Sequence, residues 1–163
     1  MAVVSDTSPL SNLAIIDRLG LLREAFGTIH IPTAVDTELN RLPNPKALSR
    51  IHAAIAENWI CVTPLVNPIT EDLRADLGSG EAAALALALQ MKAQLILLDE
   101  SEARKKAKRL ALAYTGILGV LREAKQRVRI KFLRNEIKRL RSEARFFVHP
   151  SLEKELLMSV GEQ

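Results

Sequence analysis

Two aspartates in this 163-residue chain come directly after short apolar segments of strand length. Asp6 follows Val3-Val-Ser5, and Asp99 follows Leu95-Ile-Leu-Leu98. Open parallel sheets bind ligands at the carboxyl ends of their strands, which is where both aspartates would lie. Neighbouring strands are about 4.8 Å apart, so the two carboxylates can converge on one cation if these strands are adjacent.

Two glutamates lie on predicted helix faces that should otherwise be apolar. Glu38 shares a helix face with Val35, Leu39 and Leu42, and Glu81 shares one with Leu85 and Leu89. Like charges about 4 Å apart repel by roughly 1 kcal/mol in water and by more near a protein interior, so a cluster of four acids would be protonated or would hold a cation. Carboxylates without Cys or clustered His favour Mg²⁺ or Mn²⁺, metals that commonly serve phosphate chemistry.

Each acid also has an ordinary structural explanation. Asp6 and Asp99 can cap the helices that follow them, and Glu102 can complete a capping box with Asp99. Glu81 suits a helix N-terminus. Glu38 has no capping role in mid-helix, although it can pair with a basic residue. Taken singly these explanations are at least as good, so the metal site depends on the four acids together.

The elements that must position these acids alternate along the chain. Apolar runs predict five strands, at 3–6, 28–31, 59–63, 95–98 and 113–115. Helices are predicted between them, at 10–26 as two short helices, 32–41, 47–57, 81–91, 100–112 and 117–127, with a loop around Pro68. This alternation predicts an α/β fold of three layers, with a central parallel sheet of about five strands. We expect one domain over 1–163, with 129–163 a basic helical C-terminal extension packed on it.

The net charge of +4 hides an asymmetry. Residues 104–145 hold 15 Lys and Arg against three acids, a net +12, which leaves −8 for the rest of the chain. An acidic centre beside a basic surface can hold metal ions and a polyanion together, whereas the plainer interpretation is a solvated helical face.

Other features of the composition exclude several classes. Aromatic residues make up only 4%, which does not suit stacking platforms for single strands. The single Cys61 allows no disulfide within the chain, and its apolar surroundings predict a buried, inert thiol in a reducing cytoplasm. No leader pattern or apolar run of about 20 residues is present, so we expect a soluble cytoplasmic protein without a membrane partner.

The order of these motifs resembles the PIN-domain superfamily. The matching segments are Val-Val-Ser-Asp6-Thr-Ser-Pro-Leu, Ala-Val-Asp-Thr-Glu38-Leu, Gly-Ser-Gly-Glu81-Ala-Ala and Leu-Leu-Asp99-Glu. More narrowly, the chain resembles a prokaryotic branch related to VapC-type toxins, in Gly80-Glu-Ala82, Leu98-Asp-Glu100, Ala103-Arg104, Thr115-Gly-Ile-Leu-Gly119 and Gly161-Glu162.

This resemblance implies a sheet of order 3-2-1-4-5 with helices on both faces, and an acidic pocket that binds Mg²⁺ or Mn²⁺ and hydrolyses RNA. Family members that act as toxins are silenced by a small antitoxin encoded beside them. Asp6, Glu38, Glu81 and Asp99 match the family's acidic positions, with Glu81 replacing a frequent Asp. The usual Thr or Ser shortly before the fourth acid is absent here, and Glu100 could share the ligand role.

The implied reaction is phosphodiester hydrolysis, with Asp6 and Asp99 as the principal metal ligands. The two glutamates would orient water, hold a second ion or accept a proton. Ser8 and Thr115 could add hydroxyl contacts at the same sheet edge, or act only as helix caps.

Basic residues supply candidate nucleic-acid contacts. Arg104, Lys105 and Lys108 begin within about two turns of Asp99, so one could reach a phosphate oxygen, although surface pairing with acids is the commoner fate. A later helical stripe of Arg134, Lys138, Arg141 and Arg145 could track an RNA backbone, or bind an acidic antitoxin segment or a second subunit in a homodimer. Its first three members are the candidate contacts.

Two alternatives remain open from the sequence. A haloacid-dehalogenase-like phosphatase would use Asp6 as nucleophile, but that motif wants a second Asp two residues later, where this chain has Ser8. A non-catalytic nucleic-acid or protein-binding module would need only the basic helix, with the acids as helix caps.

Overall fold

The computed structural model describes residues 1–163 and contains a five-stranded sheet in which every strand pairing is parallel. The strand order is β3-β2-β1-β4-β5, so the predicted order 3-2-1-4-5 is confirmed. The strands are β1 (Val3–Ser5), β2 (Ile29–Ile31), β3 (Ile60–Val62), β4 (Leu95–Leu97) and β5 (Tyr114–Thr115).

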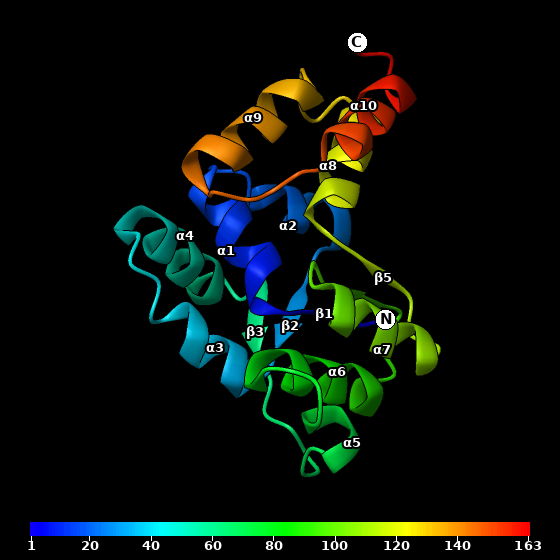
Figure 1. Ribbon diagram of the computed structural model, residues 1–163. Coiled ribbons are helices and arrows are strands. Elements are labelled where there is room, and N and C mark those ends of the chain that lie inside the picture. The colour runs from blue at the N-terminus through cyan, green and yellow to red at the C-terminus, as the bar shows by residue number, and fades with distance from the viewer.

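Helices cover both faces of this sheet, which confirms the predicted α/β class (Figure 1). One layer contains α6 with α3 and α7, and the other contains α1, α2, α4 and α8. The helices are α1 (Thr7–Ile15), α2 (Gly20–Phe26), α3 (Thr33–Leu39), α4 (Pro45–Ala56), α5 (Glu71–Arg74), α6 (Ser79–Met91), α7 (Ser101–Arg109), α8 (Ile117–Gln126), α9 (Leu133–Glu143) and α10 (Pro150–Ser159).

The hydrophobic core is centred on β1, β4 and α6. The middle residues of the paired strands, Val4 and Ile96, are fully buried. Helix α6 is rich in Ala and Leu and buries nearly every side of its first ten residues, as expected for a helix that is apolar all round. These central elements carry the strand ends and the helix start where the acids lie.

The C-terminal helices pack on α8 and on the end of α1 (Figure 1). The apolar face of α9, with Leu133, Ile137 and Leu140, is fully buried. Within that face, buried Glu136 accepts hydrogen bonds from Arg18, at 3.0 Å from Nε and 2.8 Å from a terminal nitrogen. This ion pair ties α9 to the turn that follows α1.

The predicted loop around Pro68 is confirmed, and the single-turn helix α5 that follows it was not predicted, because it is too short to produce a periodic pattern. Two local predictions are wrong. Helix α7 ends at Arg109 rather than at 112, because Ala111 adopts a left-handed backbone conformation with φ of 57°. Cys61 is partly exposed, since β3 is an edge strand. None of the helices is both long and apolar enough to cross a membrane.

Candidate functional site

Asp6 and Asp99 stand together at the carboxyl ends of adjacent strands. β1 and β4 pair in parallel with Ser5 opposite Leu97, and the Asp6 N–H donates to the Leu97 carbonyl at 3.1 Å. Asp6 occupies the N-cap position of α1 but makes no side-chain capping hydrogen bond. It is only 3% exposed, and its Oδ1 is buried without a hydrogen-bond partner. Helix capping therefore does not explain this residue.

The Asp99 carboxylate is oriented by two different helices. Its Oδ1 accepts the backbone N–H of Ile117 at 2.9 Å, so it caps α8 and not α7. Its Oδ2 accepts the Ser8 hydroxyl at 3.3 Å, and Ser8 Oγ in turn accepts a hydrogen bond from the Asn12 amide at 3.0 Å. The capping box with Glu102 is not formed. Ser8 lies at the acidic site, as predicted.

Glu38 reaches the same site from α3. Its Oε2 accepts the hydroxyl of Thr7 at 2.5 Å. The neighbouring residue of α6 is Gly80, where a Cβ atom would lie 2.6 Å from Oε2 of Glu38 and closer still to its Oε1. Only a residue without a side chain leaves room for this carboxylate between α3 and α6.

Glu81 lies in the first turn of α6 and has two roles. The backbone N–H of Gly78, at the N-cap of the helix, hydrogen-bonds to its carboxylate and acts to lower its pKa, and this first-turn position agrees with the expectation that Glu81 suits a helix N-terminus. Burial, however, raises its pKa, and the charges of Glu100 and Glu38 raise it further. Glu81 therefore belongs electrostatically to the acidic cluster, with exposed Glu100 at its edge.

The two aspartates are hard to ionise. Burial raises the pKa of Asp6 to about 7; the Thr7 N–H partly offsets this, and the charges of Glu81, Glu38 and Asp99 add to it. Burial also raises the pKa of Asp99, against the N–H of Ile117, the charge of Arg104 and the Ser8 hydroxyl. The four acids thus share one region of excess negative charge.

This region has the character of a hard-cation site without a preassembled cage. No group of three or more His, Cys, Asp or Glu side chains is gathered closely enough to hold one ion. Mutual repulsion keeps carboxylates apart when nothing neutralises them. The donor set consists of carboxylate oxygens, and the orphaned Oδ1 of Asp6 is a buried acceptor that lacks a partner. These residues fit a divalent cation of the Mg²⁺ or Mn²⁺ type.

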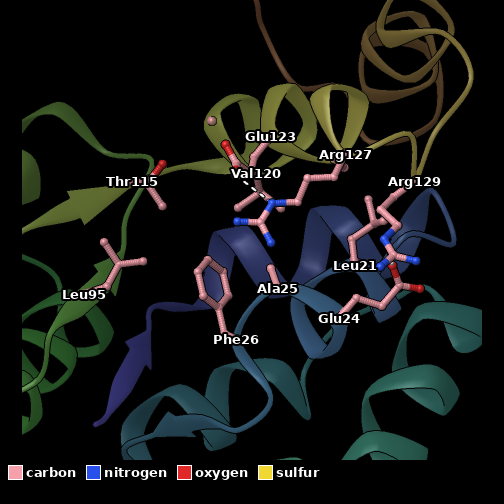
Figure 2. Close-up of a pocket in the computed structure, with 12 residues that line it drawn as sticks. Leu21, Glu24, Ala25, Phe26, Leu95, Thr115, Val120, Glu123, Arg127 and Arg129 are labelled. Carbon is pink, nitrogen blue, oxygen red and sulfur yellow. Dashed lines mark hydrogen bonds and ion pairs between the residues drawn. The ribbon is translucent and has the colours of Figure 1, made fainter.

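Thr115 is not brought to this site. It lines a cavity of about 250 Å³ between α2 and α8, which Figure 2 shows with Leu21, Phe26 and Val120 on its walls. Two ion pairs lie along its edge, and Figure 2 labels their members: Glu123 with Arg127, and Glu24 with Arg129. The hydroxyl of Thr115 packs against Gly119 in the next turn of the chain.

The predicted basic contacts divide into two groups. Arg104, Lys105 and Lys108 line a hollow that also includes Asp99, so they lie beside the acids. The α9 stripe is elsewhere, because Glu136 of α9 binds Arg18 just beyond the C-terminal end of α1, while Asp6 precedes its N-terminus. Nine helical residues separate these ends by about 14 Å. Within the stripe, Arg141 is paired with Glu153 and the Val148 carbonyl.

Several residues at the site were given no role from the sequence: Thr7, Asn12, Gly80, Tyr114 and Gly116. Asn12 could have been found, because it lies one helical turn after Ser8. The contacts of Thr7 with Glu38 and of Gly116 with Asp99 join distant parts of the chain, and no local pattern signals them.

Comparison with known families agrees with this geometry. A family model described as PIN domain matches residues 2–162, so the chain belongs to the PIN-domain family. PIN domains are generally nucleases, and those nucleases usually use divalent metal ions. No curated protein shows significant similarity to the chain.

Proposed function

We propose that this PIN-domain protein is a metal-dependent endoribonuclease that hydrolyses phosphodiester bonds in RNA. The observation that carries the proposal is the pair of buried aspartates at adjacent strand ends, one of them with an unpartnered oxygen. A buried carboxylate without a cationic partner, such as that of Asp6, is costly, and a fold retains it where it holds a cation or moves a proton.

Asp6 and Asp99 are the residues that would hold Mg²⁺ or Mn²⁺. When bound, the cation supplies Lewis acidity and neutralises charge on the attacked phosphate. Ser8 and the Ile117 N–H keep the Asp99 carboxylate in a fixed orientation. Asn12 supports this arrangement through Ser8.

The positions of the two glutamates suit them to orient a water molecule and to accept a proton from it. Glu38 is fixed by Thr7 and enclosed by Gly80, so one of its oxygens has a defined position. Glu81 is only partly buried and carries a raised pKa, which suits a group that accepts a proton from attacking water. We assign orientation of water to Glu38 and proton acceptance to Glu81.

The biological role that we propose is that of the toxin in a toxin–antitoxin pair. This rests on the resemblance to the VapC-related branch. Its partners would be RNA and a small antitoxin, with a second copy of the chain as a further partner. Exposed and unpaired cations such as Arg134 and Lys138 could contact an acidic antitoxin segment.

The test is cleavage of a panel of single-stranded and structured RNAs, with a DNA strand included, in Mg²⁺, in Mn²⁺ and in EDTA. Wild type, purified free of any antitoxin, is compared with Asp6→Asn and Asp99→Asn. Asp17→Asn is the matched control, because Asp17 is an exposed aspartate beyond the other end of α1. We expect metal-dependent cutting by wild type and by the control only.

Cutting that survives in EDTA or in both site variants would overturn the proposal. Binding of RNA without any cleavage would support a non-catalytic module, and an aspartyl-phosphate trapped at Asp6 would support a phosphatase. For the toxin role, expression of the wild type should arrest growth, and Asp6→Asn should not.

A further inference from the structure

The hollow that contains Arg104 and Lys108 adjoins the acidic site on the side of α7 and β5. It has a volume of about 370 Å³ and is lined by Asp99, Ser101, Arg104, Lys105, Lys108 and Tyr114. Asp99 belongs to both places, so a strand that binds at its carboxylate can also reach this hollow. Three of its six lining residues are cations and one is aromatic.

Arg104 is held in the hollow by contacts from three sides. Its Nε donates to the Leu98 carbonyl at 2.8 Å, and its guanidinium lies over the ring of Tyr114 at 5.6 Å from the ring centroid. A terminal nitrogen lies 3.8 Å from Asp99 Oδ1. A Cβ at Gly116 would overlap this guanidinium and lie 2.5 Å from Asp99 Oδ1, so the glycine makes the approach possible.

The fixed guanidinium still has donors to offer. Only Nε of Arg104 makes a hydrogen bond, which leaves both terminal nitrogens without an acceptor. Lys108 has no carboxylate within 4.0 Å, and Lys105 pairs only with Glu102 through two well-exposed side chains. Such an exposed pair contributes little and yields readily to a phosphate.

Tyr114 adds a flat apolar surface. It is the only tyrosine of the chain, lies on the edge strand β5 and is 38% exposed. Unpaired bases stack on aromatic rings and on Arg guanidinium planes. The low aromatic content excludes an extended platform, but a single ring with an arginine over it is enough for one base.

We infer that this hollow binds one nucleotide of an unpaired RNA strand, next to the bond that is cut. Arg104 and Lys108 hold its phosphate, and its base stacks on the Arg104–Tyr114 pair. The inference rests on the proposed function and makes the substrate single-stranded at this point, because a base within a duplex must first leave its stack at an energetic cost.

Binding is measured in EDTA, so that it does not depend on the metal or on cleavage. The probe is a fluorescein-labelled RNA of about 12 nucleotides without internal pairing, used alone and annealed to its complement. The variants are Tyr114→Leu, Arg104→Lys and Lys108→Gln. Lys154→Gln is the matched control, because Lys154 is an exposed lysine of α10, which packs on α9.

The wild type should bind the single strand more tightly than the duplex. Loss of the ring in Tyr114→Leu should weaken single-strand binding at least about fivefold and reduce that preference. Arg104→Lys keeps the charge but loses the plane and fork of the guanidinium, and should weaken binding similarly. Lys108→Gln should lower the slope of log affinity against log salt by about 0.7, and the control should change nothing.

Because Tyr114 is the sole tyrosine, 3-fluorotyrosine incorporation gives one ¹⁹F resonance that reports this position without a substitution. Unpaired RNA should shift the resonance, whereas an abasic strand of equal length should not. An unmoved resonance, equal affinity for the duplex, or variants that bind as well as the wild type would each overturn the inference.

These outcomes separate the hollow from the proposed reaction. Stacking and binding as described, without cleavage in any metal, would overturn the nuclease and leave the hollow standing. Cleavage that requires Asp6 but is accompanied by binding indifferent to Tyr114 and Arg104 would overturn the hollow alone.

Discussion

At the scale of single residues, Asp6 is expensive for the fold. Its pKa is raised from the ordinary 3.8 to about 7. The contribution of the protonated Asp6 carboxyl to stability is therefore fully present below pH 3.8, falls as the pH rises from there, and is lost once the pH has passed through 7. At about pH 8 the folded protein carries the full cost of a buried charge, because each pKa unit corresponds to roughly 1.4 kcal/mol. Asp6→Asn should therefore increase the free energy of unfolding of the metal-free protein by about 2 kcal/mol or more.

Denaturant unfolding in EDTA measures this gain, and Asp17→Asn should leave the stability nearly unchanged. Adding Mn²⁺ should reverse the order, because a cation that binds only the folded state stabilises the wild type and not the variant. A wild type that is as stable as Asp6→Asn without metal, or that gains nothing from Mn²⁺, would contradict the assignment of Asp6.

Gly80 offers a test of the position of Glu38. In Gly80→Ala the added methyl overlaps the Glu38 carboxylate, which must then leave its contact with Thr7. We expect RNA cleavage to fall by about tenfold or more, since misplacement of a functional group by 1 Å can cost about 100-fold. Thermal unfolding should show that the fold persists.

Gly20→Ala is the matched control, because no atom lies within 4 Å of a Cβ at that position and it too is helical. It should cut RNA as the wild type does. Equal activity of Gly80→Ala and Gly20→Ala would mean that the observed position of Glu38 is irrelevant to the reaction.

The acids could be predicted from the sequence because each one violates a local pattern. Asp6 and Asp99 end apolar strands, and Glu38 and Glu81 interrupt apolar helix faces. The residues that orient these acids could not be predicted, because the hydrogen bond from Thr7 to Glu38 spans 31 positions and forms only when α1 and α3 pack together. The sequence likewise shows Tyr114 only as a strand residue, and its contact with Arg104 is visible only in the folded structure.

At the scale of elements, strands and long helices were predictable because their periodicity is local and strong. The predicted end of α6 at Met91 is confirmed, but the predicted end of α7 was three residues too late. That helix stops near Ala111, which has a left-handed backbone and is not the glycine that usually signals such a stop. The role of Glu162 lies in this category too. The sequence singled it out only by resemblance, and its partners are 28 and 29 positions away.

Glu162 joins the end of the chain to the start of α9. Its carboxylate accepts the backbone N–H of Leu133 at 2.7 Å and of Arg134 at 3.1 Å, with Lys125 at 3.5 Å. Burial raises the pKa of Glu162, but these hydrogen bonds and the lysine outweigh it, so the pKa is lowered. A lowered pKa stabilises the fold above the unfolded value and ceases to do so as the pH falls through the folded one.

Glu162→Gln should therefore cost about 1 to 2 kcal/mol of unfolding free energy at neutral pH, in the range of a lost helix cap. The difference should shrink as the pH falls below 4.5, the ordinary value for the carboxyl. Urea unfolding at several pH values measures it, with exposed Glu155→Gln as the control. A penalty that is constant with pH would show that the charge plays no part.

At the scale of the whole molecule, about half of the basic residues in 104–145 pair with carboxylates of the same chain. Eight of the 15 Lys and Arg in 104–145 lie within 4.0 Å of a carboxylate, several of them structural pairs such as Lys125 with Glu162. In the α9 stripe Arg141 is paired, while Arg134 and Lys138 have no carboxylate partner. Charge counting alone therefore overstates the field that a polyanion meets.

This distribution makes strand length a discriminating variable. A single strand of about 6 nucleotides contacts only the three cations of the hollow, so the slope of its log affinity against log salt should be about −2. A strand of about 20 nucleotides also reaches Arg134 and Lys138, so its slope should approach −3.5. The double variant Arg134→Gln with Lys138→Gln should thus reduce the slope by about 1.4 for the long strand and leave the short strand unaffected. Fluorescence anisotropy in EDTA measures both, with the exposed lysines of α4 and α10 changed in Lys46→Gln with Lys154→Gln as control. If the long strand is equally indifferent to the α9 variant, RNA does not follow this helix, and its two free cations are left to a protein partner.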